Sequence, residues 1–428
     1  MSIFASKGGP GLALNSRDKE ELVRKSLERV GTVRKALLLP PDFTRFHSNA
    51  GVLTALFYQA LTERGARVDV MPALGTHVPM SDAELLEMFG PSIPRDRFLV
   101  HDWRGGIRKV GEIPSDLVQK VSEGKLAYSI DVALDHALLD PSYELILSIG
   151  QVVPHEVIGM ANHNKNVFVG CGGSDIINKT HFLGAVYNME RIMGRLRSPV
   201  RDVLDYAEEK HFSARRVVYA LTVMARGAGG HLAMNGLYIG DGREGYEAAA
   251  RLSQQVNITQ LDAPLAKVVV YLDPAEFKST WLGNKSIYRT RMAMADKGEL
   301  IVLAPGLAHF GEDKVIDGLI RKYGYVGTPR ILEATEKNED LRTNRSAAAH
   351  LIHGSSEGRF AITYAPGKLT RAEIEGVGFR WADLKATTAA YDPSKLKDGW
   401  NEVRGERVFF ISNPALGLWG LKKQFENG

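Results

Sequence analysis

The sequence has only one cysteine, Cys171, and this scarcity excludes two kinds of architecture. A single thiol cannot form an intramolecular disulfide, and it cannot contribute to a zinc cage built from several thiolates. We therefore interpret Cys171 as a small buried residue in a tight turn. A chain without disulfides is expected by default in the cytoplasm.

Long apolar runs and an excess of charge are also lacking. The apolar runs have the length of strands, and none approaches the roughly 20 residues that a membrane span needs. The N-terminal residues do not have the pattern of a signal peptide. The 54 Lys and Arg against 50 Asp and Glu give a formal net charge of +4, which is too weak to indicate a nucleic-acid partner. The sequence therefore predicts neither a membrane nor a nucleic acid as partner.

The length of 428 residues favours two domains. Short β-rich runs alternate with amphipathic stretches, which predicts an α/β fold whose domains each have a mostly parallel sheet flanked by helices. We expect an N-terminal domain over residues 1–262 and a C-terminal domain over residues 263–428. Whether the last segment packs back on the first domain is left open.

Individual elements can be predicted from the same patterns. In the first domain the predicted strands are 36–39, 67–73, 98–101 and 144–149, and the predicted helices are 49–65, with Ser48 as its cap, and one opened by a capping box at 81–84. In the second domain the predicted strands are 268–272, 300–304, 360–364 and 408–412, and the predicted helices are 286–296, 313–323 and 340–353.

Polar motifs follow four of the predicted strands in the first domain. They are Asp42-Phe43-Thr44-Arg45, Gly75-Thr76-His77, His101-Asp102 and the segment from Gly150 to His155. Each motif alone is as readily a cap or a turn as a site. Open α/β sheets bind ligands along the edge where parallel strands end. Four motifs on that edge therefore predict a ligand site.

The segment from Pro154 to His181 carries the densest set of reactive side chains. His155 and His77 can each transfer protons near neutral pH, or can be held by a backbone carbonyl. Two histidines that line one cleft could flank a substrate from opposite faces, as a racemase requires. Lys165 is either an ordinary surface lysine or a point of covalent attachment or anion contact.

A glycine-rich turn containing Gly172 and Gly173 leads into a predicted helix. Such a turn can present backbone N–H groups to a phosphate, or Ser174 can simply cap the helix. His181 falls about two turns into that helix, and alone it would make an incomplete metal site. His163, His47 and His101 are secondary candidates for the site.

These motifs resemble the lactate racemase superfamily, whose enzymes use a nickel-pincer nucleotide. The resemblance is carried by Asp42-x-Thr-Arg45, by Gly75-Thr-His77, and by His155, Lys165 and His181 in matching order and spacing. It continues more weakly around residues 287–306 and covers most of the chain. It implies an active site in the cleft between the two domains.

The resemblance also implies roles for residues of the first domain. The lysine that matches Lys165 is tethered through a thioamide to the cofactor, a pyridinium-3-thioamide-5-thiocarboxylic acid mononucleotide that binds nickel through one carbon and two sulfurs. The histidine that matches His181 completes the planar nickel site. His77 and His155 match the two acid/base histidines, while Asp42, together with Gly172 and Gly173, is assigned to the cofactor region.

The substrate side of the site is less complete. Arg45 matches a substrate-binding arginine, and Tyr288 and Arg289 are assigned to the substrate from the second domain. The implied reaction is racemisation or epimerisation at C2 of a 2-hydroxy acid by reversible hydride transfer to the cofactor. The implied partners are the substrate and the enzymes that make the cofactor, and the protein is expected as a monomer or a small homo-oligomer.

The chain departs from the family pattern at two places. Asn162-His163-Asn164 replace small residues that often precede the tethered lysine, and Met292 replaces a lysine of the second domain, with Arg289 or Arg291 available to restore its charge. Because polar groups in a site reject ligands that leave them unpaired, we hypothesise a larger hydroxylated substrate, such as a gluconate- or mannonate-type sugar acid.

Three alternatives accompany this interpretation. A racemase of lactate or another short 2-hydroxy acid is the nearest. A cofactor-free binding or sensor protein of the same fold is the second. A nicotinamide-dependent oxidoreductase is disfavoured, because the sequence has no Gly-x-Gly-x-x-Gly motif between a strand and a helix.

Overall fold

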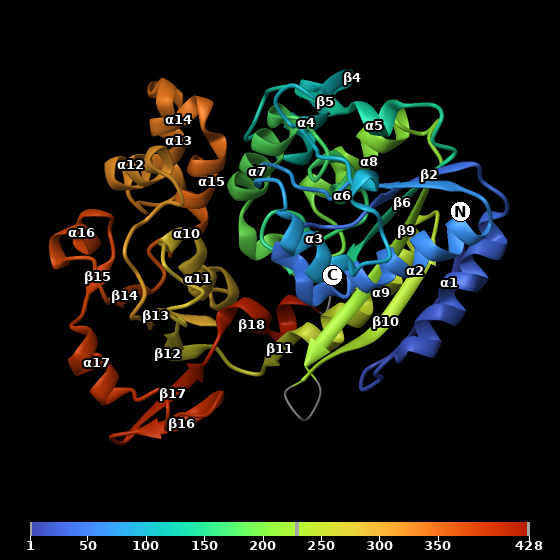
Figure 1. Cartoon of the computed structure of the whole chain (residues 1–428). Coiled ribbons are helices and arrows are strands. Elements are labelled where there is room, and N and C mark those ends of the chain that lie inside the picture. Colours follow the sequence, from blue (N-terminus) through green and yellow to red (C-terminus); the bar gives the residue numbers. More distant parts are fainter. Residues whose placement is uncertain (1, 227–230, 426–428) are drawn as a thin grey trace. The chain divides into compact units, whose positions relative to one another are not determined.

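The computed structural model describes residues 2–226 and 231–425, and it divides the chain into two compact units (Figure 1). Unit 1 comprises Met1–Thr180 and Met193–Asn257, and unit 2 comprises His181–Ile192 and Ile258–Gly428. The chain thus passes into unit 2 after Asn257, slightly before the boundary predicted from sequence. Helix α7 (Ser174–Tyr187) is continuous and contributes residues to both units.

Unit 1 is built on a mixed six-stranded sheet. Its strand order is β1 (Ile3–Gly8), β10 (Leu232–Gly240), β9 (Val217–Arg226), β6 (Leu145–Gln151), β2 (Lys35–Leu39), β3 (Arg67–Val70). The strands from β9 to β3 are parallel, whereas β1, β10 and β9 pair antiparallel. The sequence analysis did not anticipate the antiparallel half. The buried strands β2 and β6 read as continuous apolar runs because both of their faces are covered.

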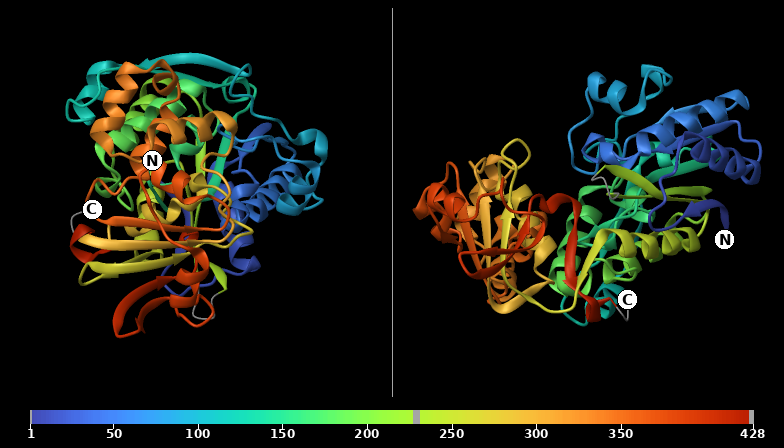
Figure 2. Two further views of the ribbon diagram at one scale, coloured as in Figure 1. Left: turned by 90° about the vertical axis from the view of Figure 1, so that its left-hand side faces the viewer. Right: turned by 90° about the horizontal axis from the view of Figure 1, so that it is seen from below.

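Helices cover both faces of this sheet (Figure 2). On one face, α1 (Ser16–Val30), α2 (Ala50–Glu63) and α3 (Asp82–Phe89) contribute to one apolar core with the strands, including Leu27, Phe57 and Met88. On the other face lie α6 (Asn164–Phe168), α8 (Pro199–His211) and α9 (Arg243–Asn257), where Phe168 packs edge-on against Phe212.

The caps of two helices test the sequence predictions. The capping box of Ser81 and Glu84 at the start of α3 is confirmed. The predicted cap of α2 at Ser48 is wrong, because Asn49, in the left-handed conformation with φ 62°, occupies that position. Ser48 still accepts a hydrogen bond from the N–H of Ala50 at 3.2 Å.

The predicted strand at 98–101 does not form. Phe98 makes only an isolated bridge to Val70 after the short helical turn η2 (Arg95–Arg97), and its ring packs on Phe89 at 5.3 Å between ring centroids. The remaining strands of unit 1 are the antiparallel pair β4 (Ile107–Ile113) and β5 (Ile130–Asp135), with α4 (Ser115–Val121) between them, and the short pair β7 (Pro154–His155) and β8 (Gly159–Met160). The short helix α5 (His136–Leu139) follows β5.

Unit 2 has a second six-stranded sheet, which is almost entirely parallel. Its strand order is β15 (Arg380–Trp381), β14 (Ala361–Pro366), β13 (Met294–Ala304), β12 (Leu265–Tyr271), β17 (Glu406–Ile411), β16 (Gly399–Val403), and only β16 runs antiparallel to its neighbour. A separate parallel pair joins β11 (Ile258–Leu261) to β18 (Leu418–Leu421), so the end of the chain pairs within unit 2.

The helices of unit 2 connect these strands. They are α10 (Thr280–Gly283), α11 (Lys285–Thr290), α12 (Lys314–Tyr323), α13 (Thr328–Lys337), α14 (Glu339–Thr343), α15 (Arg345–His353), α16 (Arg371–Gly376) and α17 (Leu384–Ala390). The predicted helix at 286–296 is too long. It ends at Thr290, because Ala293 bonds to Leu265 and Met294 already pairs with β12 as the start of β13.

The fold class predicted from sequence is confirmed: both units are α/β, with sheets that are largely parallel and flanked by helices. In residues 2–226 and 231–425, no helix is both long and apolar enough to cross a membrane.

Candidate active site

Three of the predicted motifs meet where the parallel strands of unit 1 end. The N–H of Gly75, beyond β3, donates to the carbonyl of Gly170 at 2.8 Å. The Nδ2 of Asn166, on α6, donates to the carbonyl of Leu39 at 2.9 Å and to Oγ of Ser148 at 3.0 Å. These bonds tie the segment that carries Lys165 to the ends of β2, β3 and β6. The ligand-binding edge of an open α/β sheet is therefore lined by these loops.

Asp42 and His77 form a carboxylate–imidazole pair. Asp42 lies at the start of the helical turn η1 (Phe43–Ser48), and its Oδ2 is 2.5 Å from Nδ1 of His77. Thr44 donates to the other carboxylate oxygen at 2.5 Å. Burial opposes ionisation of Asp42, but the bonds from His77 and Thr44 and the charge of Arg45 outweigh it, so the pKa of the carboxyl lies below its usual range.

This pairing fixes the chemistry of His77. An ionised carboxylate can only accept, so Nδ1 carries the proton and Nε2 of the neutral ring keeps its lone pair. The His77 side chain is 54% exposed, whereas Asp42 is nearly buried. Gly75 takes a φ of +58°, which glycine allows in the tight turn that delivers His77. His77 is thus arranged as a base oriented by a carboxylate.

His155 has the opposite arrangement. It ends strand β7, and its Nδ1 accepts the backbone N–H of Val157 at 3.1 Å. The neutral ring therefore carries its proton on Nε2. Oε2 of Glu156 lies 3.8 Å from Nδ1. The two histidines predicted from sequence thus present different groups at Nε2, an acceptor on His77 and a donor on His155.

Lys165 is the most perturbed amine of the site. It is the second residue of α6, and within residues 2–226 and 231–425 its Nζ makes no hydrogen bond or ion pair. Burial lowers its pKa to about 8, with the charges of Arg45 and Arg201 acting in the same direction and Glu156 opposing them. An ordinary lysine titrates near pH 10.4, so this amine is far more often neutral and nucleophilic.

The glycine turn has a packing role. A side chain at Gly172 would lie 1.9 Å from the carbonyl oxygen of Phe168, and one at Gly173 would lie 2.5 Å from Ile107. The N–H of Gly173 donates to the carbonyl of Ala133 at 3.0 Å. The expectation that Gly173 offers this donor to a phosphate is therefore wrong, although α7 does begin at Ser174 as predicted.

The secondary candidates His101 and His47 lie in different surroundings. His101 is buried, with Nδ1 2.8 Å from the carboxylate of Asp135 and Nε2 3.2 Å from the carbonyl of Gly172, so it braces the glycine turn. His47 lies exposed on η1.

The candidates of unit 2 lie on two helices. His181 is on α7, about two turns after its start as predicted, and it is half-buried. On α11, Tyr288 is buried with its hydroxyl 2.7 Å from Nδ1 of His350, and Arg289 is half-buried. Arg291 and Met292, which follow α11, are both buried.

Arg291 does not supply a replacement charge for the missing lysine. Its guanidinium pairs with Glu190 at 3.1 Å and donates to the carbonyl of His353 at 3.1 Å. Met292 is 1% exposed, as a core residue. Of the two arginines considered from sequence, only Arg289 keeps a partly exposed side chain.

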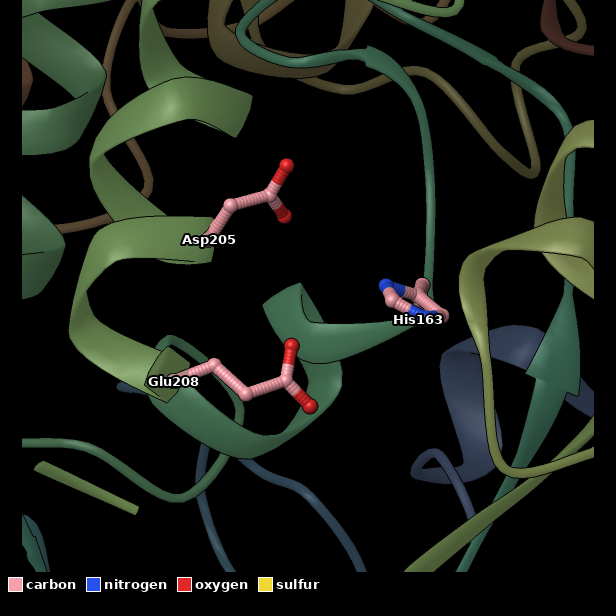
Figure 3. Close-up of side chains that lie close together, drawn as sticks. All are labelled: His163, Asp205 and Glu208. Atoms are coloured by element: carbon pink, nitrogen blue, oxygen red, sulfur yellow. The ribbon is translucent and has the colours of Figure 1, made fainter. Parts of the chain in front are cut away.

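Sequence reasoning missed a cluster of charged side chains behind Lys165. His163, Asp205 and Glu208 bring a ring nitrogen and carboxylate oxygens within 4.8 Å of one another (Figure 3). Asp205 and Glu208 come from α8, and Arg201 of the same helix is fully buried. The only available signal was this spacing of charged residues on an amphipathic helix, and such spacing usually marks a solvated face.

The chain is thus a two-unit α/β protein whose predicted acid/base and amine residues follow the parallel strands of unit 1. Residues 19–194, which include every proposed catalytic and cofactor residue, match the family model of the lactate racemase N-terminal domain. This part of the chain is therefore similar to the lactate racemase N-terminal domain.

Solved structures agree on the fold. A protein from Thermotoga maritima is 24% identical, with a TM-score of 0.78 over 97% of this chain and 100% of that chain. The lactate racemase apoprotein of Thermoanaerobacterium thermosaccharolyticum is 15% identical, with a TM-score of 0.70 over 97% of this chain and 99% of that chain. No curated protein matches the sequence.

Proposed function

We propose that the protein is a racemase or epimerase acting at C2 of a 2-hydroxy acid, and that Lys165 carries a nickel-pincer nucleotide through a covalent bond. One observation carries the proposal. The amine of Lys165 has no partner in the described part of the chain, its pKa lies near 8, and it stands at the strand edge where both histidines are placed. An unpaired amine with a lowered pKa is suited to forming a covalent bond.

In unit 1, Lys165 fits such a cofactor, because its amine would hold it covalently. The resemblance assigns the imidazole ligand to His181, and imidazole together with soft sulfur donors suits nickel. A lysine that served only the fold would be expected to have a partner, because a buried ammonium group without one lowers the stability of the folded protein. When bound, the cofactor supplies a cationic ring able to accept a hydride from C2 of the substrate.

The side chains of this protein would handle the proton of the C2 hydroxyl. His77 accepts that proton at Nε2, and the ionised Asp42 stabilises the imidazolium that results. His155 donates a hydrogen bond from Nε2 to the C2 oxygen. To return a proton on the other face, His155 would act as its imidazolium, which would give up the bond from Val157 at Nδ1 and take Glu156 as its partner there. Arg45 would bind the substrate carboxylate.

The size of the substrate is a second question. The sugar-acid hypothesis relied on polar groups at 162–164 and at Arg289 or Arg291. Asn164 and Arg291 are buried and bond to residues of their own unit, and the ring of His163 is buried against two tyrosine rings, so these groups no longer favour a more hydroxylated substrate. The hypothesis now rests on Asn162 and Arg289. A screen of 2-hydroxy acids from lactate to aldonates by chiral chromatography decides it, and turnover of lactate alone would reject a sugar acid.

Intact-protein mass spectrometry tests the cofactor. The protein is produced together with cofactor-maturation enzymes, and a mass adduct on Lys165 is expected in wild type and absent from Lys165→Ala. Lys179→Ala is the matched control, because Lys179 pairs with Asp175 at 2.8 Å and should not affect the adduct. A racemising preparation with unmodified Lys165 would contradict the tether. The complete absence of an adduct and of activity would favour a binding or sensor protein.

A further inference from the structure

We infer that Arg201 and Asn164 are positioning residues for Lys165, because they hold the turn formed by residues 162–164 in the conformation from which the lysine amine projects. The inference deepens the proposed function, since it concerns how the tether residue is prepared. Neither residue is required to touch the substrate.

The turn before Lys165 is strained. Asn162 has a φ of +67° and His163 has a φ of +59° with a ψ of −138°. Residues other than glycine in this region are strained, and they persist only where their surroundings determine them. A turn of this kind needs strong local contacts to keep its shape.

Asn162 is fitted to strand β6. Its Oδ1 accepts the N–H of His163 at 2.8 Å, and a side chain on Gly150 would lie 2.0 Å from its Nδ2. Gly150, at the carboxyl end of β6, therefore leaves the space that the Asn162 amide occupies. The two residues are complementary in shape.

Arg201 holds the turn through several hydrogen bonds. It is fully buried, and its guanidinium donates to the carbonyl of Met160 at 2.8 Å and to the carbonyl of Asn162 at 3.2 and 3.3 Å. It also donates to Oδ1 of Asn164 and to the hydroxyl of Tyr246 at 3.3 Å. Hydrogen bonds from a charged donor are stronger than those from a neutral donor, so this set of bonds can offset the strain of the turn.

Asn164 joins the turn to helix α8. Its Nδ2 donates to Asp205 at 2.7 Å and to Glu208 at 3.0 Å. Glu208 also accepts from the hydroxyl of Tyr219 at 2.5 Å, and Asp205 pairs with Arg243. Asn164 is 0% exposed, so all of these contacts are made inside unit 1.

The ring of His163 completes the packing. It lies between Tyr219 and Tyr246, with ring centroids 4.1 and 5.1 Å away. Burial and the charges of Arg201 and Arg243 lower the pKa of His163 well below its usual value, so the ring is neutral. The carboxylates of Asp205 and Glu208 face this ring in Figure 3.

A metal ion is not the better interpretation of this cluster. Asp205 and Glu208 already accept from Asn164, Arg243 and Tyr219. The charges of Arg201 and Arg243 also act on this cluster. We therefore interpret the cluster as a polar support for the turn at residues 162–164.

The test measures the reactivity of Lys165 in folded protein that lacks the cofactor. Wild type, Arg201→Lys and the control Arg197→Lys are acylated briefly with limiting acetic anhydride between pH 6 and 10, and Lys165 modification is quantified by peptide mass spectrometry. Arg197 is exposed just before α8, so the control makes the same chemical change outside the network. The charged groups that act on Lys165 are Arg45, Glu156 and Arg201.

Arg201→Lys keeps the charge and loses the multiple bonds to the turn. Its Lys165 should become more hydrated, and labelling at pH 8 should fall about five-fold or more, as a one-unit rise in pKa implies. Arg197→Lys should match wild type. Equal labelling profiles for wild type and Arg201→Lys would overturn the inference.

Asn164→Ala provides a second variant if Arg201→Lys does not fold, which circular dichroism would reveal. It should also reduce labelling at pH 8, with folding retained. An unchanged profile in a folded Asn164→Ala protein would overturn the inference. Because the labelling does not need the cofactor, a missing adduct after maturation would reject the proposed function and leave this result interpretable.

Discussion

The parallel strands of the two units end in different chemical surroundings. In unit 2, a cavity of about 1120 Å³ opens at the strand ends, lined by residues that include Tyr271, Trp381 and Phe410. The charged groups in that lining serve the fold, since Asp383 caps α17 and Asp392 accepts from Ser394. In unit 1, the strand ends instead carry an unpaired amine and two oriented histidines. The volume of a cavity is therefore a poorer guide to chemistry here than perturbed ionisation.

The buried polar groups show the same contrast. In unit 2, His350 lies between two tyrosine hydroxyls, with Tyr288 at 2.7 Å and Tyr325 at 2.9 Å, and Tyr325 also bonds to Thr280 at 2.8 Å. Burial raises the pKa of Tyr325, so its hydroxyl keeps its proton and can donate in this chain of hydrogen bonds. In unit 1, the polar network instead ends next to an amine that has no partner in the described residues.

The largest expected effect comes from the oriented base. His77→Ala should lower kcat by about 10²–10⁴-fold, because a positioned general base contributes that much. The Lys165 adduct should remain, as measured by intact mass. His136→Ala, at an exposed histidine of α5, serves as the control. Full activity of His77→Ala would mean that the strand ends of unit 1 carry no general base at His77, and the proposed difference from unit 2 would be lost.

The carboxylate partner should have a smaller effect. Asp42→Asn keeps the size of the side chain but removes the charge that stabilises protonated His77, so kcat should fall about 10- to 100-fold, which is part of the general-base contribution. Initial rates at saturating substrate measure this, with the exposed Asp82→Asn as the control. A rate equal to wild type would show that Asp42 only supports the fold of η1.

Replacing the unpaired amine should stabilise the unloaded protein. The pKa of Lys165 is about 8 in the folded protein and about 10.4 when unfolded. Below pH 8 the amine is charged in both states and the folded state bears the full penalty, whereas above about pH 10.4 it is neutral in both and the penalty is gone. Lys165→Met should therefore raise the free energy of unfolding by about 1–3 kcal/mol at pH 7.

Urea denaturation at pH 7 and near pH 10.5 measures this difference, and the gain should disappear at the higher pH. Lys179→Met is the control, because Lys179 is paired with Asp175. A destabilised Lys165→Met at pH 7 would mean that the amine has a favourable partner in solution.

The smallest effect is expected in unit 2. Tyr325→Phe removes a hydroxyl from a neutral hydrogen-bonded chain and should lower the free energy of unfolding by about 1 kcal/mol. The Lys165 adduct should be unchanged, as intact mass would show. Loss of the adduct in a folded Tyr325→Phe protein would make unit 2 part of the chemistry of the tether.

The sequence predicted the parts of the site that depend on strand ends. Asp42, His77 and His155 follow buried apolar strands, whose carboxyl ends must meet at one sheet edge. The support behind Lys165 could not be predicted, because Arg201, Asp205 and Glu208 come from a helix whose pattern also fits a solvated face. The positive φ of Asn162 and His163 was hidden as well, since neither residue type requires it.

The secondary structure shows a similar limit. The parallel strands were found because they are short, apolar and bounded by turns. The helix predicted at 286–296 was overextended because Arg291 to Asp296 have helical composition, whereas pairing of Met294 with Leu265 decides their conformation. Local preference is overruled there by tertiary contact.

The lowered pKa of Lys165 has a practical consequence for handling the unloaded protein. A neutral amine reacts with cyanate, which accumulates in old urea solutions, so in folded protein kept in urea too dilute to unfold it, Lys165 would be carbamylated ahead of the ordinary lysines. Folded protein kept in such solutions would carry a blocked tether and would look inactive. Fresh denaturant, or native purification throughout, avoids mistaking this damage for a missing function.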